Sequence, residues 1–444
     1  MTPETPPSPA QSLTHRSILA IAVPVMISNV STPLIGVVDT AVVGQIPDPA
    51  FIGAAAIGGL IFTFVFWGFG FLRMGTTGLT AQALGGGNIE EMATILGRSL
   101  LVALAAGAAL IVLQWPIREA AFAAIHASPR VEGLARGYFD IRIWAAPATL
   151  ANYALLGWFI GQGRTDIGLI LQLVLNLINM ALDMLFVLGF GWDVRGVAFG
   201  TFSAEVCAAV VGLGIALRHM RAMGGRWSLR SMLAPAELKR TLAVNGDIMI
   251  RTLALITAFV WFSAQGARQG DVVLAANAIL LQFISVAAFF LDGLAFATEA
   301  LVGRAIGAAH RAGLDLAVKM TTVWAAGTAV LISVALFLLG PWCIDHLTVD
   351  PAARTAAYTY LPWAAGAPLF GVWAFQLDGI FIGATQTADM RNAMLQSLLI
   401  FLAAWWLLRP WGNHGLWAAF YVHYAARAAT LLRYYPTLVR AVPA

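Results

Sequence analysis

Long apolar runs separated by short polar interruptions dominate the chain. A run of roughly 20 apolar residues is long enough to cross a bilayer as an α-helix, which satisfies its own backbone hydrogen bonds there. Such runs lie at approximately 17–44, 50–74, 92–114, 136–160, 167–189, 196–217, 240–265, 272–298, 318–340, 355–382, 392–408 and 415–435. The pattern predicts an all-α integral membrane protein with about twelve transmembrane helices.

The composition supports this class and excludes others. Of the 444 residues, 60% are hydrophobic and 11% are charged, whereas soluble domains carry about 25% charged residues. The two lysines, Lys239 and Lys319, follow Leu238 and Val318, so the chain holds no GxxxxGK[ST] loop for a nucleotide phosphate. Histidines and cysteines are too scattered for a metal site, and we expect no cofactor and no nucleic-acid partner.

The chain also repeats itself at an offset of 222 positions. Residues 81–85 (AQALG) correspond to 303–307 (GRAIG), and residues 157–161 (GWFIG) correspond to 379–383 (GIFIG). Each half holds six spans, so both halves enter the membrane in the same orientation. A parallel repeat of this kind predicts two six-helix lobes on either side of a transport path.

Basic residues concentrate in every second loop. The longest polar interruption carries Arg221, Arg226, Arg230, Lys239 and Arg240. By the positive-inside rule, we expect this segment and both termini of the multi-pass protein to lie in the cytoplasm. The predicted domains are a disordered tail at 1–14, an N-terminal lobe at 15–218, a cytoplasmic linker at 219–239 and a C-terminal lobe at 240–437.

Polar residues lie inside several spans of the first half. Asp39 lies near the outer end of the first span, and Thr201 and Glu205 in the sixth span reach a similar depth. The fifth span carries four polar residues on one helical face, namely Gln172, Asn176, Asn179 and Asp183. A carboxylate inside a span costs roughly 2.5–3.5 kcal/mol on insertion scales and marks a functional site by default.

We therefore expect Asp39 and Asp183 to form an ion-coupling and substrate site. Two carboxylates close together at low dielectric favour sharing one proton. The alternative is a structural hydrogen-bond network that holds the lobe together. The first span also contains Pro24 and Pro33, and each removes a backbone donor and clashes with the preceding turn. We interpret these prolines as a hinge, and a simple kink in a packed helix is the alternative for either alone.

The second half has charged residues of its own within the spans. Asp247 and Arg251 stand four positions apart, which predicts a neutralising pair on one helical face. Asp292 and Asp378 are candidates for a second ion or substrate site, with a structural role as the alternative.

Several segments are specific in combination, namely SNVSTPLIGVVDTAVVG, GWFIGQGRTD, NLINMALD, AFFLDGLAFATEALVG and LDGIFIGATQT. With them the chain resembles, over about 15–435, the multidrug and toxic compound extrusion transporters, most closely their DNA-damage-inducible F branch. The resemblance implies an antiporter that uses protons or sodium to export cationic or amphipathic organic compounds. It also implies contact with membrane lipids, and we expect a monomer.

The resemblance carries residues over as well. The family's coupling residues match Asp39, Asn179 and Asp183, and Na⁺ would bind at Asp39 and Asp183 if sodium is the coupling ion. Thr201 is a further match, and Pro24 matches the helix-1 proline associated with bending. Two positions depart from the family pattern: an expected asparagine falls near Leu156 with Asn152 one turn earlier, and Gly246 precedes Asp247 where a larger residue is expected.

Two other functions compete with drug export. A flippase for a lipid-linked intermediate would need a cavity lined with arginines for phosphates, and intramembrane arginines are few: Arg73, Arg251 and Arg427. An intramembrane enzyme would need a motif such as HExxH or GxSxG, and the sequence has neither. The substrate and the choice between proton and sodium stay open at this point.

Overall fold

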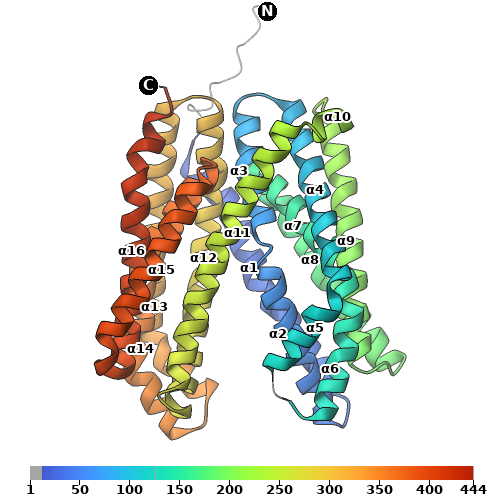
Figure 1. The fold of residues 1–444 in the computed structure, drawn as a ribbon, viewed down its shortest axis with the longest axis vertical. Coiled ribbons are helices and arrows are strands. Elements are labelled where there is room, and N and C mark those ends of the chain that lie inside the picture. The colour runs from blue at the N-terminus through green and yellow to red at the C-terminus, as the bar shows by residue number, and fades with distance from the viewer. Residues whose placement is uncertain (1–12, 126, 444) are drawn as a thin grey trace, which may run out of the picture. The chain divides into compact units, whose positions relative to one another are not determined.

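The computed structural model describes residues 13–125 and 127–443, and nearly all of the tail predicted at 1–14 lies outside this part. Within it every regular element is helical (Figure 1). The elements are α1 (His15–Val43), α2 (Pro49–Trp67), α3 (Phe71–Gly85), α4 (Ile89–Val112), α5 (Gln114–Ala124), α6 (Pro129–Arg142), η2 (Ile143–Ala145), α7 (Ala146–Gly161), α8 (Thr165–Asp183), η3 (Met184–Gly189), α9 (Val194–Ala222), α10 (Leu229–Met232), α11 (Pro235–Ala267), α12 (Asp271–Gly307), α13 (Arg311–Leu347), α14 (Pro351–Gly383), α15 (Thr387–Leu408), η4 (Arg409–Trp411) and α16 (Gly412–Arg440).

The described residues contain 11 helical segments that are long and apolar enough to cross a membrane. The last of them, Thr387–Arg440, has 54 residues and consists of α15 and α16 joined by the short turn η4. Each of the predicted apolar runs falls on one of these segments, and this last segment accounts for two runs. The prediction of an all-α membrane protein is confirmed.

Two predicted spans are interrupted helices. The second span breaks between α2 and α3, at Gly68 to Gly70. The fourth begins earlier than predicted, at Pro129, and changes to a 3₁₀ turn at Ile143–Ala145 before α7. Pro147 lies in the first turn of α7, where a missing N–H costs little, so the proline favours a new helix start rather than a continuous helix.

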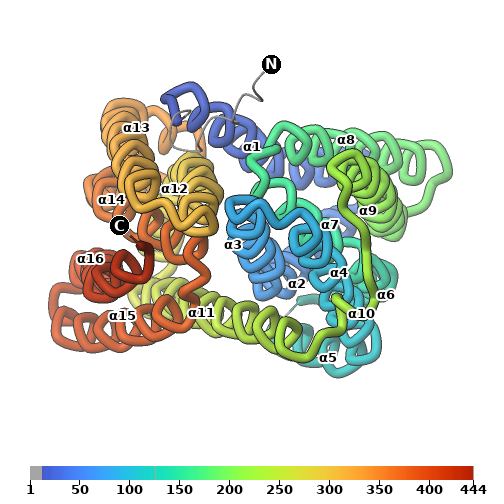
Figure 2. Tube along the Cα trace, turned by 90° about the horizontal axis from the view of Figure 1, so that it is seen from above, coloured from blue at the N-terminus to red at the C-terminus, as the bar shows by residue number. Residues whose placement is uncertain are grey.

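The chain divides into two compact units. The N-terminal unit comprises residues 27–80 and 88–245. Within it α9 packs against α2, α6, α7 and α8, and α4 packs against α7. Figure 2 shows α8 and α9 side by side. The indole of Trp158 is fully buried, and its Nε1 donates to the Met92 carbonyl at 3.0 Å, which fixes α7 against α4.

The C-terminal unit comprises 246–443 together with 13–26 and 81–87. Here α14 packs against α12, α13 and α16, and α15 packs along α16 (Figure 1). A buried aromatic cluster that includes Phe262, Phe401, Trp417 and Phe420 fills one part of it. These units are defined by packing, and residues 13–26 and 81–87 therefore belong to the C-terminal unit although they lie early in the chain. The predicted domain boundaries at 218, 239 and 437 stay a prediction.

The repeat is visible in the packing of each unit. Gly157 of α7 lies directly against the backbone carbonyl of Arg73, and Gly379 of α14 lies against that of Ala295. The offset of 222 relates Gly157 to Gly379 and Arg73 to Ala295. A side chain at either glycine would overlap the neighbouring backbone. The matching GWFIG and GIFIG motifs therefore make the same close helix contact in each half of the chain.

Candidate functional site

Asp39 and Asp183 form a carboxyl pair inside the N-terminal unit. Asp183 is fully buried at the end of α8, and Asp39 of α1 is half-buried. Their carboxyl groups are neighbours and interact electrostatically. Oδ1 of Asp39 and both oxygens of Asp183 receive no well-formed hydrogen bond from any described residue. Two ionised carboxylates repel each other and offer no donor, so one proton or a cation between them would stabilise the pair.

The backbone around Asp183 explains how the carboxyl reaches this position. The helix widens into the π-helical turn η3 directly after Asp183, and such turns are frequent at functional sites. On α9, Gly200 faces the carboxyl, and a Cβ placed there would overlap Oδ1 of Asp183. The absent side chain of Gly200 therefore makes room for the acid.

The polar face of α8 contacts both neighbouring helices. Nδ2 of Asn179 donates to Oγ1 of Thr201 at 3.2 Å, and Asn179 also adjoins Asp183. One turn earlier, Nδ2 of Asn176 donates to Oγ of Ser31 at 3.2 Å. The polar face of α8 that the sequence spacing predicted therefore contacts both α9 and α1. It brings Asn179, Asp183 and Thr201 together.

Glu205 and Asn152 form a second part of the cluster. Nδ2 of Asn152 donates to Oε2 of Glu205 at 2.8 Å and to the Glu205 carbonyl at 3.1 Å. The other carboxylate oxygen of Glu205 lies 3.6 Å from Nη2 of Arg142. Arg142 also interacts electrostatically with Asp39 and with Asp183, so it links the two parts of the cluster.

Arg142 and Tyr138 are missing from the residues predicted by sequence. Tyr138 is buried and interacts with Arg142 and with both aspartates. The available signal was Arg142 itself, an arginine within the apolar run at 136–160. An arginine in such a run needs an acidic partner, and the sixth span offered Glu205.

The charged residues of the C-terminal unit pair differently from the prediction. The predicted Asp247–Arg251 pair is wrong: Asp247 binds Nη1 of Arg391 at 2.5 Å, and Arg251 binds Asp378. The spacing of four positions places both side chains on one face of α11, but they pair with different helices. Asp247 pairs with Arg391 of α15, and Arg251 pairs with Asp378 of α14. Asp378 also accepts a hydrogen bond from Arg427, and Arg427 interacts electrostatically with Asp292.

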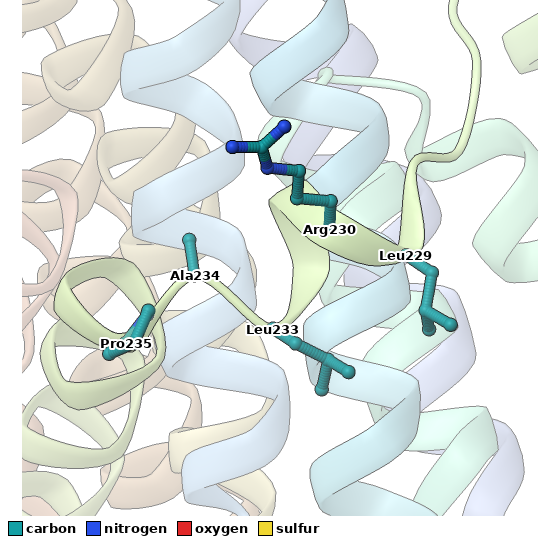
Figure 3. A pocket seen from close by; sticks show the side chains of 5 residues that line it. All are labelled: Leu229, Arg230, Leu233, Ala234 and Pro235. Atoms are coloured by element: carbon teal, nitrogen blue, oxygen red, sulfur yellow. The ribbon is translucent and has the colours of Figure 1, made fainter.

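Neither a metal cluster nor the surface hollow at α10 involves the candidate residues. Among the described residues, no group of three or more His, Cys, Asp or Glu side chains is arranged to hold a metal ion. A hollow of about 510 Å³ lies at α10, where it is lined by Leu229, Arg230, Leu233, Ala234 and Pro235 (Figure 3). It contains none of the candidate residues, and Figure 3 shows the Arg230 side chain pointing away from those of Leu229 and Leu233.

Comparison with known proteins gives consistent matches over most of the chain. The family model MatE matches twice, at residues 24–185 and 248–407. The chain is 38% identical over 423 residues to DNA damage-inducible protein F of Escherichia coli strain K12, covering 94% of this chain and 91% of that protein. It is 26% identical to the probable multidrug resistance protein NorM of Rhizobium meliloti strain 1021, covering 97% and 95%.

A solved structure shares the fold. It is described as a crystal structure of MATE in the bent conformation, and it matches with a TM-score of 0.88 and 17% sequence identity, over 98% of this chain and 96% of that chain.

Proposed function

This chain belongs to the MatE family of multidrug and toxin efflux transporters, and on that premise we propose that it is a proton- or sodium-driven antiporter. It is a multi-pass membrane transporter and not an enzyme. In the proposal it exports cationic or amphipathic organic compounds from the cytoplasm. It acts as a monomer in the bacterial inner membrane, in contact with lipids, with both termini and the linker in the cytoplasm.

The observation that carries the proposal is the carboxyl pair of Asp39 and Asp183, because Oδ1 of Asp39 and both oxygens of Asp183 are buried without a hydrogen-bond donor among the described residues. When both acids are ionised, their repulsion favours any state in which a cation reaches them. Protonation removes that repulsion and allows α1 and α8 to approach. Substrate and coupling ion then compete for one site, which yields exchange without a second energy source.

Alternating access needs a movable element, and we assign this role to α1. The helix is continuous from His15 to Val43, although Pro24 and Pro33 each remove a backbone hydrogen bond. Near the second proline, Oγ of Ser31 and Oγ1 of Thr32 both donate to the Ser28 carbonyl, at 2.8 and 3.2 Å. Side-chain bonds of this kind favour bending, so Pro24 and Pro33 support a hinge.

Both coupling ions fit the site chemically. One shared proton would supply the donor that the carboxyl pair lacks. Oδ1 of Asn179, which also lacks a donor among the described residues, adds a fourth oxygen to Oδ1 of Asp39 and the two of Asp183. A sodium ion would use these oxygens, since hard cations take several oxygen ligands.

The flippase alternative loses its main support. It called for a cavity lined with arginines for phosphates, yet Arg251 and Arg427, two of the three arginines it named, both donate to the buried carboxylate of Asp378. Arg142 lies beside three carboxyl groups that would repel a phosphate. The small-molecule antiporter therefore fits the charges of this chain better.

Efflux from proteoliposomes under separately imposed proton and sodium gradients tests the proposal. We expect Asp39→Asn and Asp183→Asn each to lower gradient-driven efflux of ethidium at least tenfold. The matched control is Asp166→Asn on the same helix α8, because Asp166 is exposed and pairs with Arg164. If both site variants fold and keep wild-type efflux under either gradient, the coupling site lies elsewhere.

A further inference from the structure

Arg142 is a buried cation with an incomplete set of partners. It is the last residue of α6, directly before the 3₁₀ turn η2, and its side chain is about nine-tenths buried. Its Nη2 lies 3.6 Å from Glu205, which is longer than a good charge-assisted hydrogen bond. Its Nη1 is buried and has no hydrogen-bond partner among the described residues. The guanidinium is thus held inside the lobe without being locked to one acceptor.

The surroundings of Arg142 are those that suit an organic cation. Its guanidinium carbon lies 5.5 Å from the ring centroids of both Phe62 and Phe66, within the range of cation–π contacts. Three carboxyl groups from three helices interact with it, namely Asp39 of α1, Asp183 of α8 and Glu205 of α9. Aromatic faces beside acids form a binding site for a positively charged group. We call the site formed by Phe62, Phe66 and Glu205 the cation seat, and the guanidinium of Arg142 occupies it.

When all three acids are ionised, their three negative charges exceed the two positive charges of Arg142 and Arg73 by one. Tyr138 of α6 and Tyr153 of α7 interact with Arg142 and are neutral, and Arg73 of α3 is a second cation near Tyr153. Charges interact strongly where water is excluded. An arginine stays protonated at any physiological pH, so the contribution of Arg142 to the site is a permanent single positive charge.

We propose that Arg142 is a specificity-determining residue that fixes how much positive charge a substrate carries into the Asp39–Asp183 site. By occupying the seat formed by Phe62, Phe66 and Glu205, it neutralises one carboxylate internally and selects substrates with one positive charge over substrates with two. Without its charge, the seat accepts the second cationic group of a dication. The inference rests on the proposed cation export and adds the charge class of the substrate.

Ethidium and propidium test this directly, because they share one ring system and differ by a cationic side arm. We expect Arg142→Gln to raise the ratio of propidium to ethidium efflux in proteoliposomes at least tenfold, a change of about 1.4 kcal/mol. Arg142→Lys keeps the charge and should keep the wild-type ratio. Glu205→Gln removes one negative charge and should shift the ratio the opposite way, which covers the case that Arg142→Gln does not fold.

The double variant Arg142→Gln/Glu205→Gln restores the net charge and should return the ratio toward that of wild type. An unchanged ratio in both Arg142→Gln and Glu205→Gln overturns this inference while leaving the antiporter intact. Wild-type protein that exports neither dye under either gradient overturns the proposed function first. A merely structural role for Arg142 would lower the efflux of both dyes equally.

Discussion

Gly85 and Gly307, which are equivalent positions of the two repeats, lie against each other's motif. Gly85 contacts the backbone carbonyl of Arg304, and Gly307 contacts the backbone carbonyl of Gln82. Each contacted residue stands three positions before the glycine of its own motif, so the contact is symmetric. Nε2 of Gln82 extends it by donating to the Gly383 carbonyl at 2.9 Å. The equivalent AQALG and GRAIG segments therefore pack on one another.

Alanine at either glycine should destabilise the protein. A Cβ at Gly85 or Gly307 would overlap a backbone carbonyl, which has no rotamer by which to move away. We expect Gly85→Ala and Gly307→Ala each to cost about 1–3 kcal/mol, as overpacking does. The measurement is the thermal melting temperature of detergent-purified protein. Gly59→Ala is the control, because no atom lies within 4 Å of its added Cβ, and melting equal to that control would contradict the contact.

The apolar pattern predicted the fold well because lipid imposes one rule on every span. In a bilayer the backbone must bond to itself, so each apolar run becomes a helix whatever its neighbours are. Interruptions were harder to see. The 3₁₀ turn at Ile143–Ala145 lies within an apolar run, and only Pro147 marks it.

Spacing along a helix predicted some neighbours of the site and missed others for a physical reason. It placed Asn176, Asn179 and Asp183 on one face of α8, and that face meets α1 and α9. The same reasoning failed for Asp247 and Arg251, because spacing within α11 carries no information about the acids and arginines of other helices. Arg142 was missed for the same reason, since its partner Glu205 lies 63 positions later in the sequence.

The corrected pairing in the C-terminal unit predicts which charges depend on each other. Asp247 binds Arg391, and Arg251 binds Asp378, so a double-mutant cycle on each of these pairs should give a coupling of about 0.5–3 kcal/mol. Asp378→Asn alone should cost about 3–5 kcal/mol, because it leaves buried guanidiniums without their carboxylate. The measurement is the free energy of unfolding in detergent.

Two comparisons control this experiment. The cycle between Asp247→Asn and Arg251→Gln should be additive within about 0.5 kcal/mol, because each residue pairs elsewhere. Asp315→Asn removes an exposed partner of Arg311 and should change stability by less than about 1 kcal/mol. A coupling between Asp247 and Arg251 as large as that between Asp247 and Arg391 would contradict the observed pairing.

Gly200 offers a way to disturb the carboxyl pair without changing an acid. A Cβ at this position would overlap Oδ1 of Asp183 and approach its backbone nitrogen to 3.3 Å. We therefore expect Gly200→Ala to displace the carboxyl from Asp39 and to lower gradient-driven ethidium efflux at least tenfold. The control on the same helix is Gly214→Ala, whose added Cβ has no atom within 4 Å and should leave efflux unchanged.

The double variant Gly200→Ala/Asp183→Asn separates this effect from a general loss of packing. If Gly200 acts through the Asp183 carboxyl, the alanine should lower efflux hardly further in a protein that already lacks the acid, because two changes acting through one group are not additive. A loss that multiplies the two single effects would show instead that Gly200→Ala damages α9 packing independently. In that case the close approach of Gly200 to Asp183 would be a matter of stability and not of ion coupling.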